Sequence, residues 1–471
     1  MCADMNPQIL LVMPRHREWM KTFPYGIATI YSVLKEHGHT VDFIDCDFEH
    51  KHLHELISAG ELSKYNIIGI GGLVSCYKTV KHDLIPFVRS SAPDALILVG
   101  GYLGISTRDL LLKQNLCDVV FQGDSEESIL EFLNVYNQPN RWKDIVGLAF
   151  RTEDGSVVDT GYRILESLES VYVPYYKYID IEKYNSHLEV SRKSYPLVVE
   201  IGCPRRCSFC FNSFGRKVVN RSPVHVIEEI RIALEKYGYP RVDMMSENLL
   251  SRPQWVREFC ERIDRYHLRF KWSACGHAKT LKEDVLSLAK TCGLDHIGIG
   301  FENFSQKILD NMNKHTDVTL YAQIIRLLRK LDLEFTGTCI FGYFGEDDQT
   351  VQENIDFNVR NFINHKYFWI QAYPLTRCYE QCLEKGLIPD EEAYIEKLGD
   401  AAEFVINLTE FPDDELFRMR DRLYAETLEG VTIRHPFEIR KICRAARYHG
   451  WKWILQRIAS KITRIARTNS G

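Results

Sequence analysis

The chain has 471 residues, of which 45% are hydrophobic and 26% charged, and its formal net charge at pH 7 is −5. This length leaves room for two or three globular domains. The net negative charge argues against a protein that binds nucleic acid, and no apolar run reaches the roughly 20 residues that a membrane span requires. We find neither a low-complexity segment nor an internal repeat, so the motifs and their spacing carry the functional signal.

Fourteen cysteines are scattered along the chain. The run from Met1 to Gln8 is polar and no cleavable apolar segment follows it, so we expect no signal peptide. Scattered cysteines without an export signal are typical of reduced thiols, and we therefore expect a cytoplasmic protein without disulfides. Most of these cysteines are expected to be small core residues.

Residues 1–150 are expected to form the first domain, because apolar strand-like segments alternate there with amphipathic helical ones. The expected strands are 8–13, 40–44, 67–71, 95–99 and 119–122, and the expected helices are 27–37 and 79–90. This alternation predicts a doubly wound, Rossmann-like parallel sheet whose ligand site lies at the C-terminal strand ends. Glycines gather near these ends: Gly69, Gly71, Gly72, Gly100, Gly101 and Gly123. They either let a ligand approach the backbone or serve tight turns alone.

Residues 151–195 are expected to form a connector. Asp154-Gly155 suits a hairpin turn, and the segment Val171-Tyr-Val-Pro-Tyr-Tyr176 suits an extended crossing because it contains a proline. Strand and helix alternation resumes from Leu197.

Residues 196–390 are expected to form the second domain. Its expected strands are 197–201, 241–245, 269–274, 296–300, 334–341 and 367–372, with a helical stretch between each pair. This pattern predicts a partial parallel barrel of the (β/α)6 type, similar to a TIM barrel, with its active site at the C-terminal strand ends.

Three cysteines directly follow the first of these strands, in the run Glu200-Ile-Gly-Cys-Pro-Arg-Arg-Cys-Ser-Phe-Cys-Phe-Asn-Ser-Phe-Gly-Arg-Lys217. Cys203, Cys207 and Cys210 have the spacing C-x3-C-x2-C, so their thiolates can converge on one soft metal centre. Three ligands leave one iron of a four-iron, four-sulfur cluster open to an outside ligand. The alternative is zinc, which favours a fourth Cys or His at short spacing, whereas the next histidine is His225.

Residues 391–471 are expected to be mainly helical. Between Arg434 and Arg467 there are ten Lys or Arg residues and one acid, Glu438. Apolar residues recur there at helical spacing, which predicts a basic amphipathic helix: Trp451, Ile454, Leu455, Ile458, Ile462 and Ile465. Such a helix either makes peripheral contact with an anionic membrane, gathers a phosphorylated or lipid substrate, or packs on the barrel with its basic face in water.

The cysteine loop resembles the signature loop of the radical S-adenosylmethionine (SAM) enzymes in its spacing, its preceding strand and the aromatic Phe209 before the last cysteine. The resemblance implies a [4Fe-4S] cluster held by Cys203, Cys207 and Cys210, with SAM on the open iron. It further implies reductive cleavage of SAM to a 5′-deoxyadenosyl radical, a small-molecule substrate and an electron donor such as flavodoxin or ferredoxin.

The same resemblance implies a SAM site at the other strand ends. Ser246 and Glu247 match the segment that meets the methionyl ammonium group, and Glu302, in Gly300-Phe-Glu-Asn303, matches the motif that holds the ribose. Ile340 and Gly342 match the adenine segment, with Glu346 one place late. An acid near a strand end is equally explained as a loop cap or a solvent-facing charge.

Two further segments match the family in part. Tyr373-Pro-Leu-Thr376 resembles the family's Tyr-Pro-Gly-Thr and lacks its glycine. Lys314 falls where the family has a lysine, although the simpler expectation is a solvated side chain after a helix.

Next to such a loop, the first domain resembles the cobalamin-binding domain of the cobalamin-dependent radical SAM family. The residues that carry this resemblance are Phe23-Pro-Tyr-Gly26, Asp42-Phe-Ile-Asp45, Gly100-Gly101 and Asp118-Val-Val-Phe-Gln-Gly-Asp-Ser-Glu126. The family has Gly-Gly-Pro-His where this chain has Gly100-Gly-Tyr-Leu103, and Gly-Glu-Gly-Glu where it has Gly123-Asp-Ser-Glu126. The chain also lacks Asp-x-His-x-x-Gly, so no histidine is marked as the lower axial ligand of cobalt.

The resemblance implies cobalamin bound base-off, with its nucleotide tail near Gly69, Gly71, Gly100 and Gly123. The expected function is then cobalamin-dependent methylation at a carbon atom of a small molecule or natural product. Dehydration, epimerisation or rearrangement without cobalamin remain alternatives that use the same cluster and SAM. A protein whose cluster only transfers electrons or senses redox state is a third, non-enzymatic alternative.

Overall fold

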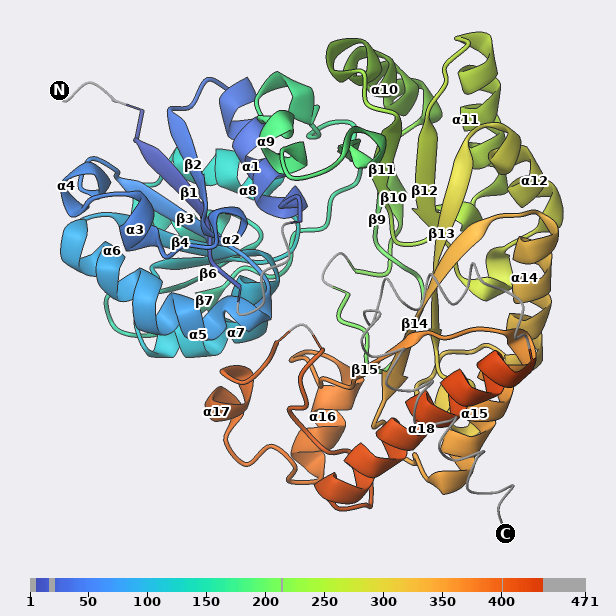
Figure 1. Ribbon diagram of the computed structural model, residues 1–471. Coiled ribbons are helices and arrows are strands. Elements are labelled where there is room, and N and C mark those ends of the chain that lie inside the picture. Colours follow the sequence, from blue (N-terminus) through green and yellow to red (C-terminus); the bar gives the residue numbers. More distant parts are fainter. Residues whose placement is uncertain (1–5, 17–21, 213–214, 400, 435–471) are drawn as a thin grey trace. The chain divides into compact units, whose positions relative to one another are not determined.

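The computed structural model describes residues 6–16, 22–212, 215–399 and 401–434 (Figure 1). The chain divides into two compact units. The first comprises residues up to 347 together with 365–413, and it contains both large sheets. The second comprises 348–364 and the chain from 414 onward.

The N-terminal sheet has seven strands in the order β2-β1-β3-β4-β5-β6-β7. Its strands are β1 (Ile9–Met13), β2 (Val41–Asp45), β3 (Ile67–Gly71), β4 (Leu96–Gly100), β5 (Val119–Phe121), β6 (Leu148–Arg151) and β7 (Val157–Asp159). The first five run parallel, whereas β6 and β7 are antiparallel. The predicted doubly wound parallel sheet is therefore confirmed, with a hairpin at Asp154-Gly155 that carries the sheet into the segment expected as a connector.

Helices follow most of these strands. The longer ones are α1 (Tyr25–Glu36), α6 (Ile85–Ser91), α7 (Gly101–Lys113) and α8 (Glu126–Leu133), and the short ones include α2 (Cys46–Glu49), α3 (Leu53–Leu56), α4 (Ala59–Leu62) and α5 (Tyr77–Thr79). Alternate residues of one strand enter two different apolar clusters, as Leu10 and Leu11 of β1 do. Both faces of the sheet are thus covered, which explains why its strands read as continuous apolar runs.

The second sheet has six strands, all parallel, in the order β15-β14-β13-β12-β11-β8. They are β8 (Ser194–Val198), β11 (Arg241–Met245), β12 (Lys271–Cys275), β13 (Leu294–Glu302), β14 (Glu334–Phe341) and β15 (Lys366–Trp369). The intervening helices include α10 (Pro223–Tyr237), α11 (Pro253–Arg265), α12 (Glu283–Thr291), α13 (Gln306–Asn311) and α14 (Val318–Lys330). The predicted partial barrel is confirmed.

The strand predicted at 197–201 is two strands in the structure. β8 ends at Val198, and β9 (Glu200–Ile201) instead pairs antiparallel with β10 (Val219–Asn220). Gly202 makes this pairing feasible, because its φ is +85° and a Cβ there would lie 2.1 Å from the Lys217 carbonyl oxygen. The cysteine loop is therefore closed at its base by a short antiparallel clasp.

The C-terminal segment continues with α16 (Arg377–Glu384), α17 (Glu391–Ile395) and α18 (Asp413–Arg434). In the second unit, α18 lies alongside α15 (Asp348–Asn361), as Figure 1 shows. A Cβ added at Gly430 would lie 2.5 Å from Val359 Cγ2, so the two helices pack closely there.

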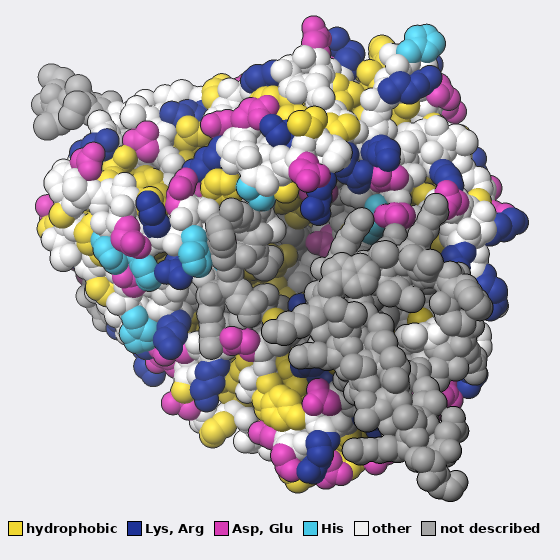
Figure 2. Space-filling view, in the orientation of Figure 1, with side chains coloured by type: hydrophobic (Ala, Val, Ile, Leu, Met, Phe, Trp, Pro, Cys, Tyr) yellow, Lys and Arg dark blue, Asp and Glu magenta, His cyan; other side chains and the backbone are white. Residues whose placement is uncertain are grey.

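The basic amphipathic helix predicted between Arg434 and Arg467 lies outside the described residues, apart from Arg434 itself. Among the helices that are described, none combines the length and hydropathy required to span a bilayer. On the face shown in Figure 2, Lys and Arg side chains of the described residues are interspersed with Asp and Glu side chains.

Candidate active site

The cysteine loop forms a tight turn at the C-terminal end of the barrel's first strand. Cys203 and Cys207 are half-buried and Cys210 is exposed. The Cys210 amide donates a hydrogen bond to the Cys207 carbonyl at 3.2 Å, and the Asn212 side chain donates one to the Cys203 carbonyl at 3.0 Å. The loop thus has a fixed backbone shape that presents all three thiols.

Loops after later strands anchor this turn. The Ser208 amide donates to the Met312 carbonyl at 2.9 Å, and the Asn313 side chain donates to the Arg206 carbonyl at 2.7 Å. At the start of α16, the Cys378 amide donates to the Ser208 carbonyl at 2.8 Å. Backbone segments after β13 and β15 therefore hold the loop between Cys203 and Cys210 in place.

The three thiols lie close enough to influence one another. Desolvation of the thiol by the surrounding protein, together with the neighbouring Cys207, Glu247 and Cys203, raises the pKa of Cys210 to about 12. Thiols in such surroundings ionise only when a cationic centre binds them. Within the residues that the structure describes, no group of three or more His, Cys, Asp and Glu side chains converges closely enough to hold a metal ion. Ligation by the three cysteines therefore stays a prediction.

Glu200 connects the ends of three strands. Its buried carboxylate accepts hydrogen bonds from the Asn248 amide at 2.9 Å and from Arg252 Nε at 2.7 Å. The Asn248 side chain in turn accepts one from the His277 amide at 2.8 Å. The segments after β9, β11 and β12 are thereby fixed relative to one another, and this brings Ser246 and Glu247 to the cysteine loop.

Ser246 and Glu247 have unused hydrogen-bonding capacity. Ser246 Oγ is buried without a hydrogen-bond partner, and the exposed Glu247 carboxylate makes no hydrogen bond or ion pair with the described residues. Burial by the surrounding protein raises the pKa of Glu247, and the nearby Glu200 adds to this shift. A hydroxyl and a carboxylate left open in this way fit an ammonium group, which needs acceptors.

Glu302 and Lys314 form a buried ion pair. Lys314 Nζ donates to Glu302 Oε1 at 2.8 Å, and each residue is only 7% exposed. The expectation of a solvated Lys314 is therefore wrong, because left-handed residues at Asn313 and His315 turn the chain inward after α13. Burial on its own would lower the pKa of Lys314, and the Glu302 carboxylate outweighs it and raises that pKa. Glu302 itself has φ +65°, a costly conformation for a non-glycine residue that is typical of functional sites.

The buried carboxylate of Glu346 holds the segment that follows β14. Glu346 is buried and accepts hydrogen bonds from the Gly342 amide at 2.5 Å and the Tyr343 amide at 3.3 Å. Burial raises the pKa of Glu346 to about 7. Gly342 needs its glycine because φ is +86°, and the half-buried Ile340 offers its carbonyl to Asn303 at 3.3 Å. Glu346 thus shapes the loop that carries Ile340 and Gly342.

Two further residues at this end of the barrel are the aromatic Phe209 and the apolar Leu375. Phe209, between two of the cysteines, is half-buried and packs against the larger apolar cluster. Leu375, where the resemblance leads one to expect glycine, has φ +67° and is 58% exposed. The left-handed backbone at Leu375 therefore costs conformational free energy that burial of the side chain does not offset.

Because of this strain, we expect Leu375→Gly to increase the free energy of unfolding by about 0.5 to 1 kcal/mol, measured by denaturant titration. Leu383→Gly is the matched control, since Leu383 is also exposed and apolar yet lies in α16. That control should lose up to about 1 kcal/mol, because glycine is unfavourable in a helix. A loss of stability in Leu375→Gly would show that the side chain makes contacts that offset its strain.

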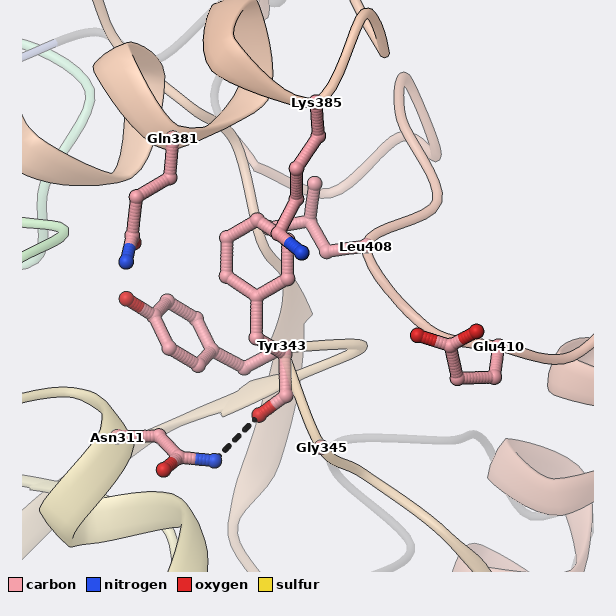
Figure 3. Close-up of a pocket in the computed structure, with 8 residues that line it drawn as sticks. Asn311, Tyr343, Gly345, Gln381, Lys385, Leu408 and Glu410 are labelled. Carbon is pink, nitrogen blue, oxygen red and sulfur yellow. Dashed lines mark hydrogen bonds between the residues drawn. The ribbon is translucent and has the colours of Figure 1, made fainter.

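A cavity of about 290 Å³ is lined by residues that follow β13, β14 and β15 (Figure 3). It is lined by Asn311, Tyr343, Phe344, Gly345, Gln381, Lys385, Leu408 and Glu410. The Tyr343 hydroxyl and Ser208 Oγ share a hydrogen bond of 2.7 Å, so one wall of the cavity is tied to the loop. None of the predicted SAM-binding residues lines it.

The four glycines predicted near a cobalamin tail fall into two groups. Gly71 and Gly100 end β3 and β4, and a Cβ at Gly100 would meet only Phe121, at 3.6 Å. Gly69 lies inside β3, where a Cβ would come within 2.7 Å of Leu11, and Gly123 has φ +84° with a Cβ position 2.0 Å from the Arg163 carbonyl oxygen. Gly69 and Gly123 are therefore required by close packing within the protein, while Gly71 and Gly100 lie at the C-terminal ends of their strands.

The residues that depart from the family pattern are built into the fold. Leu103 is fully buried in the larger apolar cluster, and its amide donates to the Gly72 carbonyl at 2.9 Å. The buried Asp124 accepts a hydrogen bond from the Leu165 amide at 2.7 Å, and burial raises the pKa of Asp124 to about 6. The Tyr102 ring packs edge-on against Phe211, with ring centroids 4.8 Å apart, directly after Cys210.

Sequence reasoning missed His16, which follows β1. Its side chain is buried, and Nδ1 lies 3.2 Å from a carboxylate oxygen of Asp47 in an ion pair. The strand order changes direction between β1 and β3, and a ligand crevice is expected at such a switch point. Open space around Gly26 therefore fits a bulky ligand at this edge of the sheet.

Comparison with known proteins identifies two regions of the chain. Residues 198–357 match the model of the radical SAM superfamily, and residues 20–133 match that of the B12 binding domain. The class of protein is therefore that of the radical SAM enzymes. Within it, the chain belongs to the members that join a B12-binding domain to the radical SAM barrel. The predicted cofactors, a [4Fe-4S] cluster, SAM and cobalamin, are confirmed at the level of these domains.

Individual relatives agree with this assignment. "Uncharacterized methyltransferase PH0819" of Pyrococcus horikoshii is 24% identical over 395 residues, 81% of this chain and 84% of the relative. The anaerobic magnesium-protoporphyrin IX monomethyl ester cyclase of Cereibacter sphaeroides is 27% identical over 70% of this chain, which spans 55% of that relative. The radical SAM methyltransferase TsrM of Kitasatospora setae, solved with cobalamin and a [4Fe-4S] cluster, shares the fold with a TM-score of 0.66, at 16% identity over 81% of this chain and 75% of TsrM.

Proposed function

We propose that the protein is a cobalamin-dependent radical SAM methyltransferase that adds a methyl group to a carbon atom of a small molecule. The observation that carries this proposal is the presence, in one chain, of a B12-binding domain and a cysteine loop at the strand ends of a radical SAM barrel. The contact between Tyr102 and Phe211 supports it, because it brings the first domain to the cysteine loop. The names of relatives support it too, since PH0819 and TsrM are both methyltransferases.

The site residues take the following proposed roles. Cys203, Cys207 and Cys210 hold the cluster, and Phe209 packs the loop between them. Ser246 and Glu247 accept hydrogen bonds from the ammonium group of SAM. Glu302 binds the ribose, and Lys314 holds the Glu302 carboxylate in position. Ile340 and Gly342 border the adenine. When bound, the cluster supplies the electron that cleaves SAM, and cobalamin supplies the methyl group.

The domain organisation and partners extend this proposal. We assign cobalamin to residues 1–150, the SAM chemistry to 196–390 and a helical appendage to 391–471. The described cysteines are free thiols, which supports a reducing, cytoplasmic location. An electron donor such as flavodoxin or ferredoxin is required by the chemistry, and contact of the basic C-terminal helix with a membrane stays a proposal.

Anaerobic protein loaded with iron, sulfide and hydroxocobalamin provides the test. With SAM labelled as CD3 and a low-potential reductant, we expect 5′-deoxyadenosine together with a product heavier by one CD3 group. Corrin and iron content, measured on the same sample by visible spectroscopy, report whether both cofactors are bound. Deoxyadenosine and a modified product without any label would instead favour dehydration, epimerisation or rearrangement.

We expect Glu247→Gln to weaken SAM binding by about 1.5 to 3 kcal/mol, because it removes the charge that accepts from an ammonium group. Equilibrium binding of SAM to the cluster-loaded protein measures this loss. Glu258→Gln is the control, since the half-buried Glu258 lies on α11, accepts a hydrogen bond from Gln254 and belongs to no predicted site. Equal SAM affinity in wild type and Glu247→Gln would assign the ammonium to another acceptor.

A further inference from the structure

The barrel strands present one face whose side chains are largely accessible. In-register pairing places Asp243 of β11 beside Ser273 of β12, and Cys275 of β12 beside Gly298 of β13, on that face. The alternate residues, such as Val242 and Ala274, are buried on the opposite face. Asp243 and Cys275 therefore line the inner surface of the barrel, below the strand ends that carry the cysteine loop and Glu247.

Asp243 makes no ion pair with the described residues, and the nearby cation, Arg241, is paired elsewhere. Its carboxylate accepts a single hydrogen bond, from the Tyr25 hydroxyl at 3.2 Å. Arg241, two residues earlier on the same face, is held by Asp295 through two hydrogen bonds of 2.5 and 2.9 Å. Lys271 also lies nearest to Asp295, at 3.8 Å. The cations at the base of the barrel are thus committed to Asp295.

Cys275 lies close to the carboxylates of Asp243 and Glu247, and its pKa responds to their charge. Its thiol is exposed, and a Cβ at Gly298 would lie 3.1 Å from its sulfur, so small neighbours keep the space around it open. Burial raises the pKa of Cys275, and the carboxylates of Glu247 and Asp243 raise it further. Both carboxylates therefore act on the volume in front of this thiol.

The charges of this region leave one carboxylate without a counterpart. Glu247 is assigned to the ammonium of SAM, and Lys314 is paired with Glu302. Lys366 lies on the opposite edge strand, β15, where its ammonium sits over the Phe368 ring at 4.5 Å. Asp243 faces the open space with the Tyr25 hydroxyl as its hydrogen-bond donor, while the nearby Arg241 is paired with Asp295 and His296 is hydrogen-bonded to Thr336.

We propose that Asp243, together with the Tyr25 hydroxyl, binds a cationic group of the substrate, so that the substrate is an organic cation such as a protonated amine. This inference rests on the proposed function, because it treats the inner surface of the barrel as the substrate space. Asp243 is then a residue that determines substrate specificity, since a carboxylate in a partly enclosed space favours ligands of opposite charge.

Charge-selective modification of Cys275 tests the proposal without any turnover. Cluster-loaded protein is treated anaerobically with a cationic or an anionic methanethiosulfonate reagent of similar size, and modification of the Cys275 peptide is followed by mass spectrometry. Each rate is divided by the rate of the same reagent with glutathione. We expect the cationic reagent to be favoured at Cys275, and Asp243→Asn to reduce this preference about fivefold to tenfold.

Matched variants distinguish this effect from a structural one. Tyr25→Phe removes the hydroxyl and keeps the charge, so the preference should persist. Asp332→Asn, at a fully exposed side chain, should leave the preference unchanged. An anionic reagent that reacts as well as the cationic one, an unaltered ratio in Asp243→Asn, or a thiol closed to both reagents would each overturn the proposal.

A second measurement uses deoxyadenosine formation by the fully loaded enzyme. Pairs consisting of an amine and its N-acetyl derivative, such as glucosamine and N-acetylglucosamine, are compared as stimulators. Stimulation by amines that is lost in Asp243→Asn supports the assignment, and a neutral substrate methylated equally by both proteins overturns it. Failure to form deoxyadenosine under any condition would contradict the proposed function, while the thiol ratio would still report on Asp243.

Discussion

Replacing any one of Cys203, Cys207 and Cys210 with alanine is expected to abolish reductive cleavage of SAM. In the proposed site each thiolate supplies one of the three protein ligands of the cluster, and two ligands would not hold a four-iron centre with a single open iron. Iron and sulfide content after anaerobic reconstitution, and deoxyadenosine formed per hour, measure the effect. We expect activity to fall below detection in all three variants.

Cys117→Ala is the control for this series, because Cys117 is buried in the N-terminal sheet layer and belongs to no predicted site. It should keep both the iron content and the activity of the wild type. A triple variant of the loop that retained full iron, sulfide and activity would assign the cluster to other residues.

Lys314→Met is expected to lower the free energy of unfolding by about 3 to 5 kcal/mol, because it leaves the buried Glu302 carboxylate without its cation. The side chains of this pair are only 9% and 10% exposed, so water screens the remaining charge weakly. Denaturant unfolding of the apoprotein at neutral pH measures the loss.

The double variant Lys314→Met/Glu302→Gln should recover most of this stability, because no uncompensated charge remains. Lys330→Met breaks the exposed pair with Glu283 and serves as the control, with an expected cost of less than about 1 kcal/mol. A Lys314→Met variant as stable as Lys330→Met would mean that Glu302 finds water or another donor.

The sequence allowed the architecture to be predicted because the first five strands of the N-terminal sheet and all six strands of the barrel are parallel. Strands covered on both faces read as short apolar runs, and β3, β11 and β14 begin and end close to the predicted residues. The break between β8 and β9 was missed, since apolar residues continue across it and only the positive φ of Gly202 marks the turn. Antiparallel pairing of β9 with β10 depends on residues that are remote in sequence, and periodicity carries no signal of it.

The site was predictable where short motifs carry it. The spacing of the cysteines and the order of polar strand ends gave Cys203, Glu247 and Glu302 as candidates, and their contacts with the cluster and SAM stay predictions. The burial of Lys314 was not predictable, because a lysine after a helix has the same local pattern whether it turns inward or outward. The packing role of Gly69 was equally hidden, since only the structure shows Leu11 occupying the space of its missing side chain.

The anchors of the cysteine loop also constrain when the cluster site comes into existence during synthesis. The hydrogen bond at the Arg206 carbonyl requires Asn313, which is synthesised 107 residues later, and the one at the Ser208 carbonyl requires Cys378, which follows later still. A ribosome that has translated only the cysteine loop has made the ligands without the backbone contacts that shape them. We therefore expect iron delivered to the nascent chain to be unproductive until α16 has emerged, so that assembly of the proposed cluster follows completion of the barrel.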